Sequence, residues 1–405
     1  MPREESVRFL VKLARALHMY GTPAHRIEAA MEVATERLGL PSQFFALPTV
    51  ILASFGEPEA RSTGLIRVQP GSADLEKLVL LDEVLKDLLR GRTDPEEAAA
   101  AVDAIEARPH RYGEWARLGA SAIVSACIAC FFGGGVRELL LSALLGVMTS
   151  LVGRLQRIRS GFQRVHEPFA AFLVSFVALF AAHTVGPLSS YVVTVSALII
   201  LLPGLQMTTA ISELASQSLV SGTVRLVSAL VVLFELVVGV ALGRTLEESL
   251  FGPATEVISV ALPAWTKVIA LCAAPAAYTV LFRAQPRDFL PILVVGVLAF
   301  AGAQLGARIA VPDVDLDFGG FLGAFVVAVA GNLWARRVDR PVAVTTLPGI
   351  LLLVPGSVGF RGIVDLLEHN VESGIQTAFR MMFVAAAIVA GLLFANIAAP
   401  ARRPF

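Results

Sequence analysis

The sequence predicts a mostly α-helical, polytopic membrane protein, with ten transmembrane helices arranged as a 5+5 inverted repeat after a small N-terminal α+β cytosolic domain. Composition is the first observation: 56% of the 405 residues are hydrophobic and 16% are charged, whereas a soluble domain carries about a quarter charged residues. The second observation is that residues 1–117 hold much of this charge, and nearly everything after Leu118 is apolar. An internal repeat is the third.

The repeat relates residues 198–244 to a segment that lies 152 residues further along the chain, and ten of the 47 aligned positions are identical. Pro203-Gly204 recurs as Pro355-Gly356, and Ser221-Gly222 recurs as Ser373-Gly374. Internal symmetry in an apolar chain is typical of secondary transporters, whose substrate site lies where the two related halves meet. The pattern therefore favours a transporter.

Residues 1–112 predict the cytosolic domain. Residues 6–20 and 23–38 have amphipathic helical patterns, and in the break between them Thr22 suits the N-cap and Pro23 the first helical turn. Segments 43–55 and 61–69 are rich in β-branched and aromatic residues and predict two or three strands. Two more helices are expected at 73–90 and 94–107, the second capped by Asp94. The charged first fifteen residues do not resemble a cleaved signal peptide.

Ten apolar segments follow, each close to the roughly 20 residues that a spanning helix needs. They form two membrane repeats, at 113–245 and 262–400. The segments are 116–133, 137–154, 168–186, 190–205, 223–243, 264–283, 288–307, 318–336, 342–358 and 376–398. Because five crossings is an odd number, the two repeats are expected to face opposite ways.

Loop charges predict the orientation. Eleven arginines lie in the loops and tail on the side of the N-terminal domain, against about three on the opposite side. Lys and Arg are enriched in cytoplasmic loops. We therefore expect a multi-pass protein of the cytoplasmic (inner) membrane with both termini in the cytoplasm.

Familiar catalytic motifs are absent from the sequence: it has no P-loop, GxSxG or HExxH. Cys127 and Cys130 form a CxxC without a second pair, and His18 and His25 have no paired ligand. We therefore predict no enzyme, no catalytic residues, no metal and no cofactor. The expected partners are the lipid bilayer and a small amino acid or carboxylate substrate, not nucleic acid; a homo-oligomer is left open.

Glu235 is the most unusual residue of the membrane region, because it lies near the middle of an apolar segment. A charge there costs about 2.5–3.5 kcal/mol on insertion scales. A carboxyl group that exchanges its proton with both sides suits proton-coupled export, so Glu235 is predicted as the proton-coupling residue. The alternative is a protonated Glu that bonds a neighbouring helix.

The two Pro-Gly pairs are expected to break helices within or at the edge of the membrane. Broken helices leave free backbone groups that bind the charged ends of small solutes. Each pair is followed by an acid, Glu213 or Asp365. The predicted substrate-binding residues are Pro203, Gly204, Gln206, Glu213, Ser221, Gly222, Arg225, Pro355, Gly356 and Asp365. The simpler interpretation is an interfacial turn followed by a surface helix.

Together these features resemble the threonine/serine exporter family. The resemblance rests on Pro203-Gly204, then Glu213, then Ser221-Gly222-Thr223-Val224-Arg225, and on N-terminal helices in which a glycine-containing break precedes Arg26 and Glu28. It implies a soluble N-terminal domain, ten spans and efflux of threonine and serine. The family more often has Asp where this chain has Glu213.

We therefore expect a secondary-active exporter of small polar metabolites, threonine and serine first, driven by protons. One alternative is export of dicarboxylates such as succinate by the same architecture. Another is a membrane protein whose N-terminal domain is catalytic, and a third is a channel or scaffold without coupling.

Overall fold

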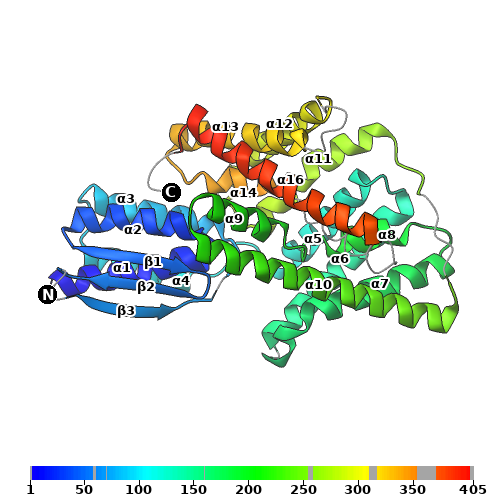
Figure 1. The fold of residues 1–405 in the computed structure, drawn as a ribbon, viewed down its shortest axis with the longest axis horizontal. Coiled ribbons are helices and arrows are strands. Elements are labelled where there is room, and N and C mark those ends of the chain that lie inside the picture. Colours follow the sequence, from blue (N-terminus) through cyan, green and yellow to red (C-terminus); the bar gives the residue numbers. More distant parts are fainter. Residues whose placement is uncertain are drawn as a thin grey trace.

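The structure is a computed structural model, and it describes residues 2–57, 61–69, 71–158, 160–253, 259–309, 317–353 and 371–401. An N-terminal α+β domain lies at one end of an elongated helical bundle (Figure 1). The described bundle comprises two successive sets of helices, one before and one after residue 254.

The N-terminal domain follows the predicted order of elements. Its helices are α1 (Pro2–Met19), α2 (Ala24–Leu38), α3 (Leu75–Leu89) and α4 (Pro95–Ala107). Strands β1 (Ser42–Leu47), β2 (Val50–Phe55) and β3 (Ser62–Arg67) form an antiparallel meander in the order β1-β2-β3. Asp94 caps α4 as predicted, because its side chain accepts a hydrogen bond from the Glu97 amide at 2.8 Å.

The start of α2 differs from the prediction. Thr22 was expected at the N-cap, but Pro23 occupies that position and makes no side-chain cap, and the helix begins at Ala24. Proline has no side-chain acceptor, so the first free amide of α2 needs a partner from elsewhere. That partner is Glu213 of the membrane region, at 3.0 Å from the Ala24 nitrogen.

The first set of bundle helices comprises α5 (Glu114–Phe131), α6 (Val136–Ile158), the short η2 (Ser160–Arg164), α7 (His166–Thr184), α8 (Ser190–Leu198), α9 (Gly204–Ala215) and α10 (Leu219–Phe251). The second set comprises α11 (Ala264–Leu281), η3 (Pro286–Asp288), α12 (Phe289–Ala307), α13 (Phe318–Val338), α14 (Ala343–Leu351) and α16 (Val371–Ala398). Corresponding helices start at close to the spacing of the sequence repeat.

Eight helices in the described residues are long and apolar enough to cross a membrane, so the expected ten spans are not confirmed. The two predicted spans without such a helix are 190–205 and 342–358, the second of which continues beyond the described residues. They contain α8 and α14, which have nine residues each. At 1.5 Å per residue such a helix covers about 14 Å, half of the roughly 30 Å hydrocarbon layer.

Glycines let the long helices cross closely in both sets. A Cβ on Gly239 of α10 would collide with the backbone oxygen of Pro168 in α7. A Cβ on Gly391 of α16 would likewise collide with the backbone oxygen of Phe321 in α13. The same kind of glycine contact therefore joins the same pair of helices in each set.

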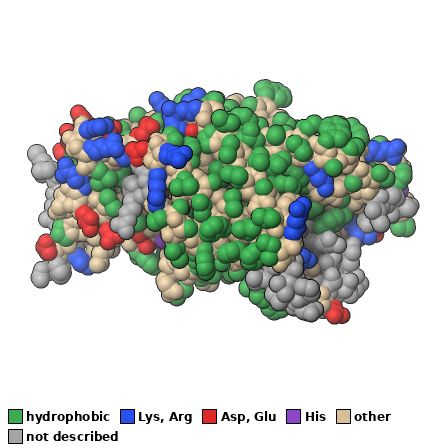
Figure 2. Space-filling view, turned by 90° about the horizontal axis from the view of Figure 1, so that it is seen from above, with side chains coloured by type: hydrophobic (Ala, Val, Ile, Leu, Met, Phe, Trp, Pro, Cys, Tyr) green, Lys and Arg blue, Asp and Glu red, His purple; other side chains and the backbone are tan. Residues whose placement is uncertain are grey.

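Large hydrophobic side chains cover the outside of the bundle (Figure 2). Leu140, Leu144, Val268 and Leu290 are each more than 60% exposed. The charged side chains gather over the N-terminal domain and toward the ends of the bundle (Figure 2). An apolar surface of this extent is stable against lipid rather than water.

The N-terminal domain is docked on the second set of helices. The amide of Leu75, at the start of α3, donates to the Phe282 carbonyl at 2.9 Å, and buried Asp74 pairs with Arg283 at 3.2 Å. Lys86 pairs with Asp339 at 3.1 Å. The core of the domain also includes Ala284 and Ile292. Hence α11 and α13 end, and α12 and α14 begin, beside the domain.

Candidate functional site

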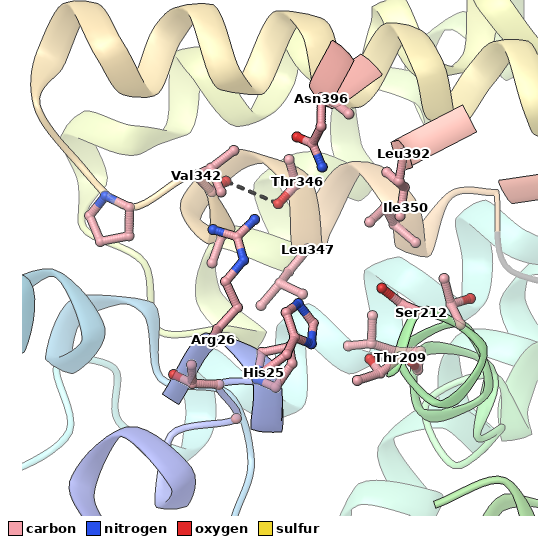
Figure 3. A pocket seen from close by; sticks show the side chains of 18 of the residues that line it. His25, Arg26, Thr209, Ser212, Val342, Thr346, Leu347, Ile350, Leu392 and Asn396 are labelled. Atoms are coloured by element: carbon pink, nitrogen blue, oxygen red, sulfur yellow. Dashed lines mark hydrogen bonds between the residues drawn. The ribbon is translucent and has the colours of Figure 1, made fainter. Parts of the chain in front are cut away.

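A cavity of about 340 Å³ lies where the N-terminal domain meets the bundle. The start of α2, helix α9, the start of α14 and the ends of α13 and α16 surround it (Figure 3). Its volume falls within the range of small-molecule pockets. Its polar lining residues are Thr22, His25, Arg26, Thr208, Thr209, Ser212, Ser216, Asn332, Thr346 and Asn396.

The predicted helix break at Pro203-Gly204 builds one wall. Helix α8 ends at Leu198 and α9 starts again at Gly204, with Pro203 at its N-cap. The hydroxyls of Thr208 and Thr209 donate to the carbonyls of residues four positions earlier, at 3.1 and 2.8 Å. Their oxygens keep lone pairs that can accept a hydrogen bond. The break therefore turns a hydroxyl-bearing helix toward the cavity.

The opposite wall carries amides. The Asn332 amide of α13 donates to Asn396 Oδ1 at 3.0 Å and to the Ala399 carbonyl at 2.7 Å, which joins α13 to the end of α16. Figure 3 shows Asn396 and Thr346 on the side of the cavity away from α2. This wall offers polar groups to a ligand and carries no charge.

The N-terminal domain supplies His25 and Arg26. Both side chains rise from the first turn of α2 into the cavity, His25 on the side of Thr209 and Ser212 (Figure 3). Burial lowers the pKa of His25, and the neighbouring Arg26 adds to this effect. Burial also lowers the pKa of Arg26 from its ordinary value, but a guanidinium stays protonated at neutral pH. The cavity therefore pairs a neutral imidazole with a cation.

Glu213 lies beside the cavity and does not line it. Its carboxylate is fully buried and accepts from the Ala24 amide at 3.0 Å, the Ser221 hydroxyl at 2.9 Å, and Arg225 Nε and Nη2 at 3.0 and 3.2 Å. Four donors occupy both oxygens. In this structure Glu213 joins α2, α9 and α10.

The Ser-Gly-x-x-Arg motif completes this junction. The chain turns between α9 and α10 at Gln217, which has a positive φ of 65°. A Cβ on Gly222 would lie 2.8 Å from the Ala210 oxygen and 2.9 Å from the Leu214 nitrogen. Only glycine allows the two helices to approach so closely. Ser221, Gly222 and Arg225 thus have a structural explanation in the packing of α9 against α10.

The other predicted site residues lie elsewhere. Gln206 is exposed on α9, away from the described cavity lining. Pro355, Gly356 and Asp365 fall outside the described residues. Glu235 is half-buried on α10 and interacts electrostatically with His166 and Glu167, in the first turn of α7. It does not line the cavity.

None of the described residues predicted to bind substrate lines the cavity. Thr209, Ser212, Asn332 and Thr346 are single polar side chains in apolar helices, and no spacing connects them. Arg26 belongs to the soluble domain, far along the chain from the membrane helices. The helix break that precedes it was the available signal. Among the described residues, no three His, Cys, Asp or Glu side chains gather as a metal site.

Long apolar helices with a hydrophobic exterior define a multi-pass membrane protein. Residues 8–246 match a family described as "Putative threonine/serine exporter", and residues 267–398 match one described as "Threonine/Serine exporter". The chain belongs to the threonine/serine exporter family.

Curated relatives include Pheromone-regulated membrane protein 10 of Saccharomyces cerevisiae, which is 30% identical over 387 residues, 92% of this chain and 48% of that protein. The protein of the same name from Eremothecium gossypii is 27% identical over 391 residues, 93% of this chain and 50% of that protein. This chain spans about half the length of these relatives. No solved structure matches it.

Proposed function

We propose that the protein exports small polar metabolites, threonine and serine first, across the cytoplasmic membrane. The observation that carries this proposal is the cavity of about 340 Å³ at the break before α9. Its hydroxyls, amides and single guanidinium can bind a small zwitterion. Family membership supports the same substrate class.

The proposed mechanism is alternating access by two repeats of opposite orientation. The opposed directions of corresponding helices support it. Helix α10 begins beside the N-terminal domain, where Arg225 and Ala24 share Glu213, whereas α16 ends on that side, where Ala399 contacts Asn332. Helices α8 and α14 are short in both repeats. Their ends pack on one apolar cluster, through Ile199 and Leu351.

Proton coupling through Glu235 is part of the proposal. Its neighbours support this role, because His166 and Glu167 form an ion pair at 2.7 Å next to it. A histidine and two carboxyl groups can share and pass protons. The docked domain and the end of α16 lie on the same side of the bundle, and we place both termini in the cytoplasm.

Dicarboxylate export is the second candidate. One observation favours it: among the described lining residues Arg26 carries the only charge, so no carboxylate opposes a second negative group. A zwitterion remains the first candidate, because the hydroxyl oxygens of the lining can accept hydrogen bonds from an ammonium group, which a dicarboxylate lacks.

Transport by the purified protein in liposomes tests the proposal. Labelled threonine, serine and succinate are compared as substrates under an imposed proton gradient. Ser212→Leu, which puts an apolar side chain into the cavity, should lose most of the flux. Ser228→Leu on the exposed face of α10 is the matched control and should keep it. The exporter proposal fails if the wild type moves none of the three solutes, or if both variants transport alike.

A further inference from the structure

Arg26 differs from the other arginines at the junction of domain and bundle. Arg283 pairs with Asp74, Arg225 with Glu213, and Arg340 with Asp288. No carboxylate among the described residues lies within ion-pair distance of Arg26. Its guanidinium instead projects into the cavity (Figure 3).

An unpaired guanidinium that is largely withdrawn from water is unfavourable, because it loses hydration without gaining a counter-ion. An anionic ligand reverses that loss. Guanidinium binds carboxylate through two parallel hydrogen bonds, and this geometry selects a planar, singly charged group.

The walls around Arg26 suit the rest of an amino acid. The hydroxyl oxygens of Thr209 and Ser212, across the cavity on α9, can accept hydrogen bonds from an ammonium group. His25 adds a neutral nitrogen: its Nδ1 is buried and has no hydrogen-bond partner within the described residues. Among the described lining residues no acid competes for Arg26.

We propose that Arg26 is the carboxylate-binding residue of the cavity, so that the N-terminal domain forms part of the substrate site. This inference rests on the proposed exporter function and adds a specific role for the domain. The substrate holds the first turn of α2 against α9 and α14. Release of the carboxylate then accompanies movement of α2 away from α9.

A comparison of ligands that differ only in the carboxylate tests the role of Arg26. The binding of L-threonine and L-threoninamide is measured on the purified full-length protein. The wild type should prefer threonine by about 10- to 100-fold, the range for one charge-assisted hydrogen-bonded pair. Arg26→Gln should abolish this preference, and Arg26→Lys should keep part of it.

Arg37→Gln is the matched control, because Arg37 lies exposed on the same helix and outside the cavity. It should bind as the wild type does. Thermal melting of each variant separates loss of binding from loss of folding, and if Arg26→Gln is unstable then Arg26→Lys carries the comparison. Succinate and succinamate form the equivalent pair for a dicarboxylate substrate.

The outcomes separate the two proposals. If the wild type distinguishes acid from amide and Arg26→Gln distinguishes them equally well, the exporter function stands and the role of Arg26 is wrong. If the wild type binds none of the four ligands, the exporter proposal itself fails, and the role of Arg26 fails with it.

Discussion

Replacement of Glu213 by Gln should weaken the contact of the start of α2 with α9 and α10. The Gln oxygen can still accept from the Ala24 amide or the Ser221 hydroxyl. Its NH₂ group, however, meets the donors of Arg225, which lie 3.0 and 3.2 Å from the carboxylate. Breaking a buried ion pair by removing one partner costs about 3–5 kcal/mol. Because the Arg225 side chain keeps 20% exposure, we expect the lower end, about 3 kcal/mol.

Hydrogen exchange at the start of α2 measures this effect. A loss of about 3 kcal/mol corresponds to roughly 100-fold faster exchange of the Ala24 amide and its neighbours. Glu32→Gln, on the exposed face of the same helix, is the control and should leave exchange unchanged.

A double replacement tests the charge argument. Glu213→Gln combined with Arg225→Met removes both charges, keeps an oxygen that can accept from the Ala24 amide, and leaves no guanidinium to meet the Gln NH₂ group. The double variant should therefore exchange more slowly than Glu213→Gln. Unchanged protection in Glu213→Gln, or faster exchange in the double variant, would refute the reasoning.

Three further predictions follow from other parts of the structure. Burial lowers the pKa of His18 and His25. Below about pH 6.5 these histidines are therefore protonated in the unfolded chain but stay neutral in the folded chain, and this difference favours unfolding. The melting temperature should fall in that pH range, and it should fall less in the variant with both histidines replaced by Gln. Gly222→Ala should lower the free energy of unfolding by about 1–3 kcal/mol, because the added methyl group overpacks the contact of α9 with α10. Gly119→Ala should leave it unchanged, because a Cβ there meets no atom within 4 Å. Chemical denaturation in detergent measures both values. Glu235→Gln should fold and bind substrate but lose gradient-driven flux, and proton-driven transport equal to that of the wild type would contradict its assignment.

The N-terminal elements were predictable because each has a local signal. Examples are the break at Gly21, the Asp94 cap and the β-branched segments around Gly56. Pro203-Gly204 likewise predicted where α9 starts. Hydropathy could not identify α8 and α14 as short, because a short apolar helix followed by further apolar residues has the same average as a full span.

The site was only partly predictable. The acid and the Ser-Gly-x-x-Arg pattern correctly indicated α9 as part of the site. Their residues, however, join α9 to α10, whereas other residues of α9, Thr208, Thr209 and Ser212, line the cavity. Arg26 could not be placed by sequence, because its position depends on the contact between Ala24 and Glu213, which are 189 residues apart. Such a long-range contact leaves no periodic pattern in the chain.

The hydrophobic core of the N-terminal domain includes Ala284 and Ile292, at and before the first turn of α12. Because of this shared core, residues 1–112 should move together with the second repeat. In the proposed alternating-access cycle, the sheet β1-β2-β3 would travel with that repeat, and the contact of α2 with α9 would open or close. Energy transfer between a fluorophore on the exposed sheet and another at position 217 would therefore report the change in distance during transport, without a label inside the membrane.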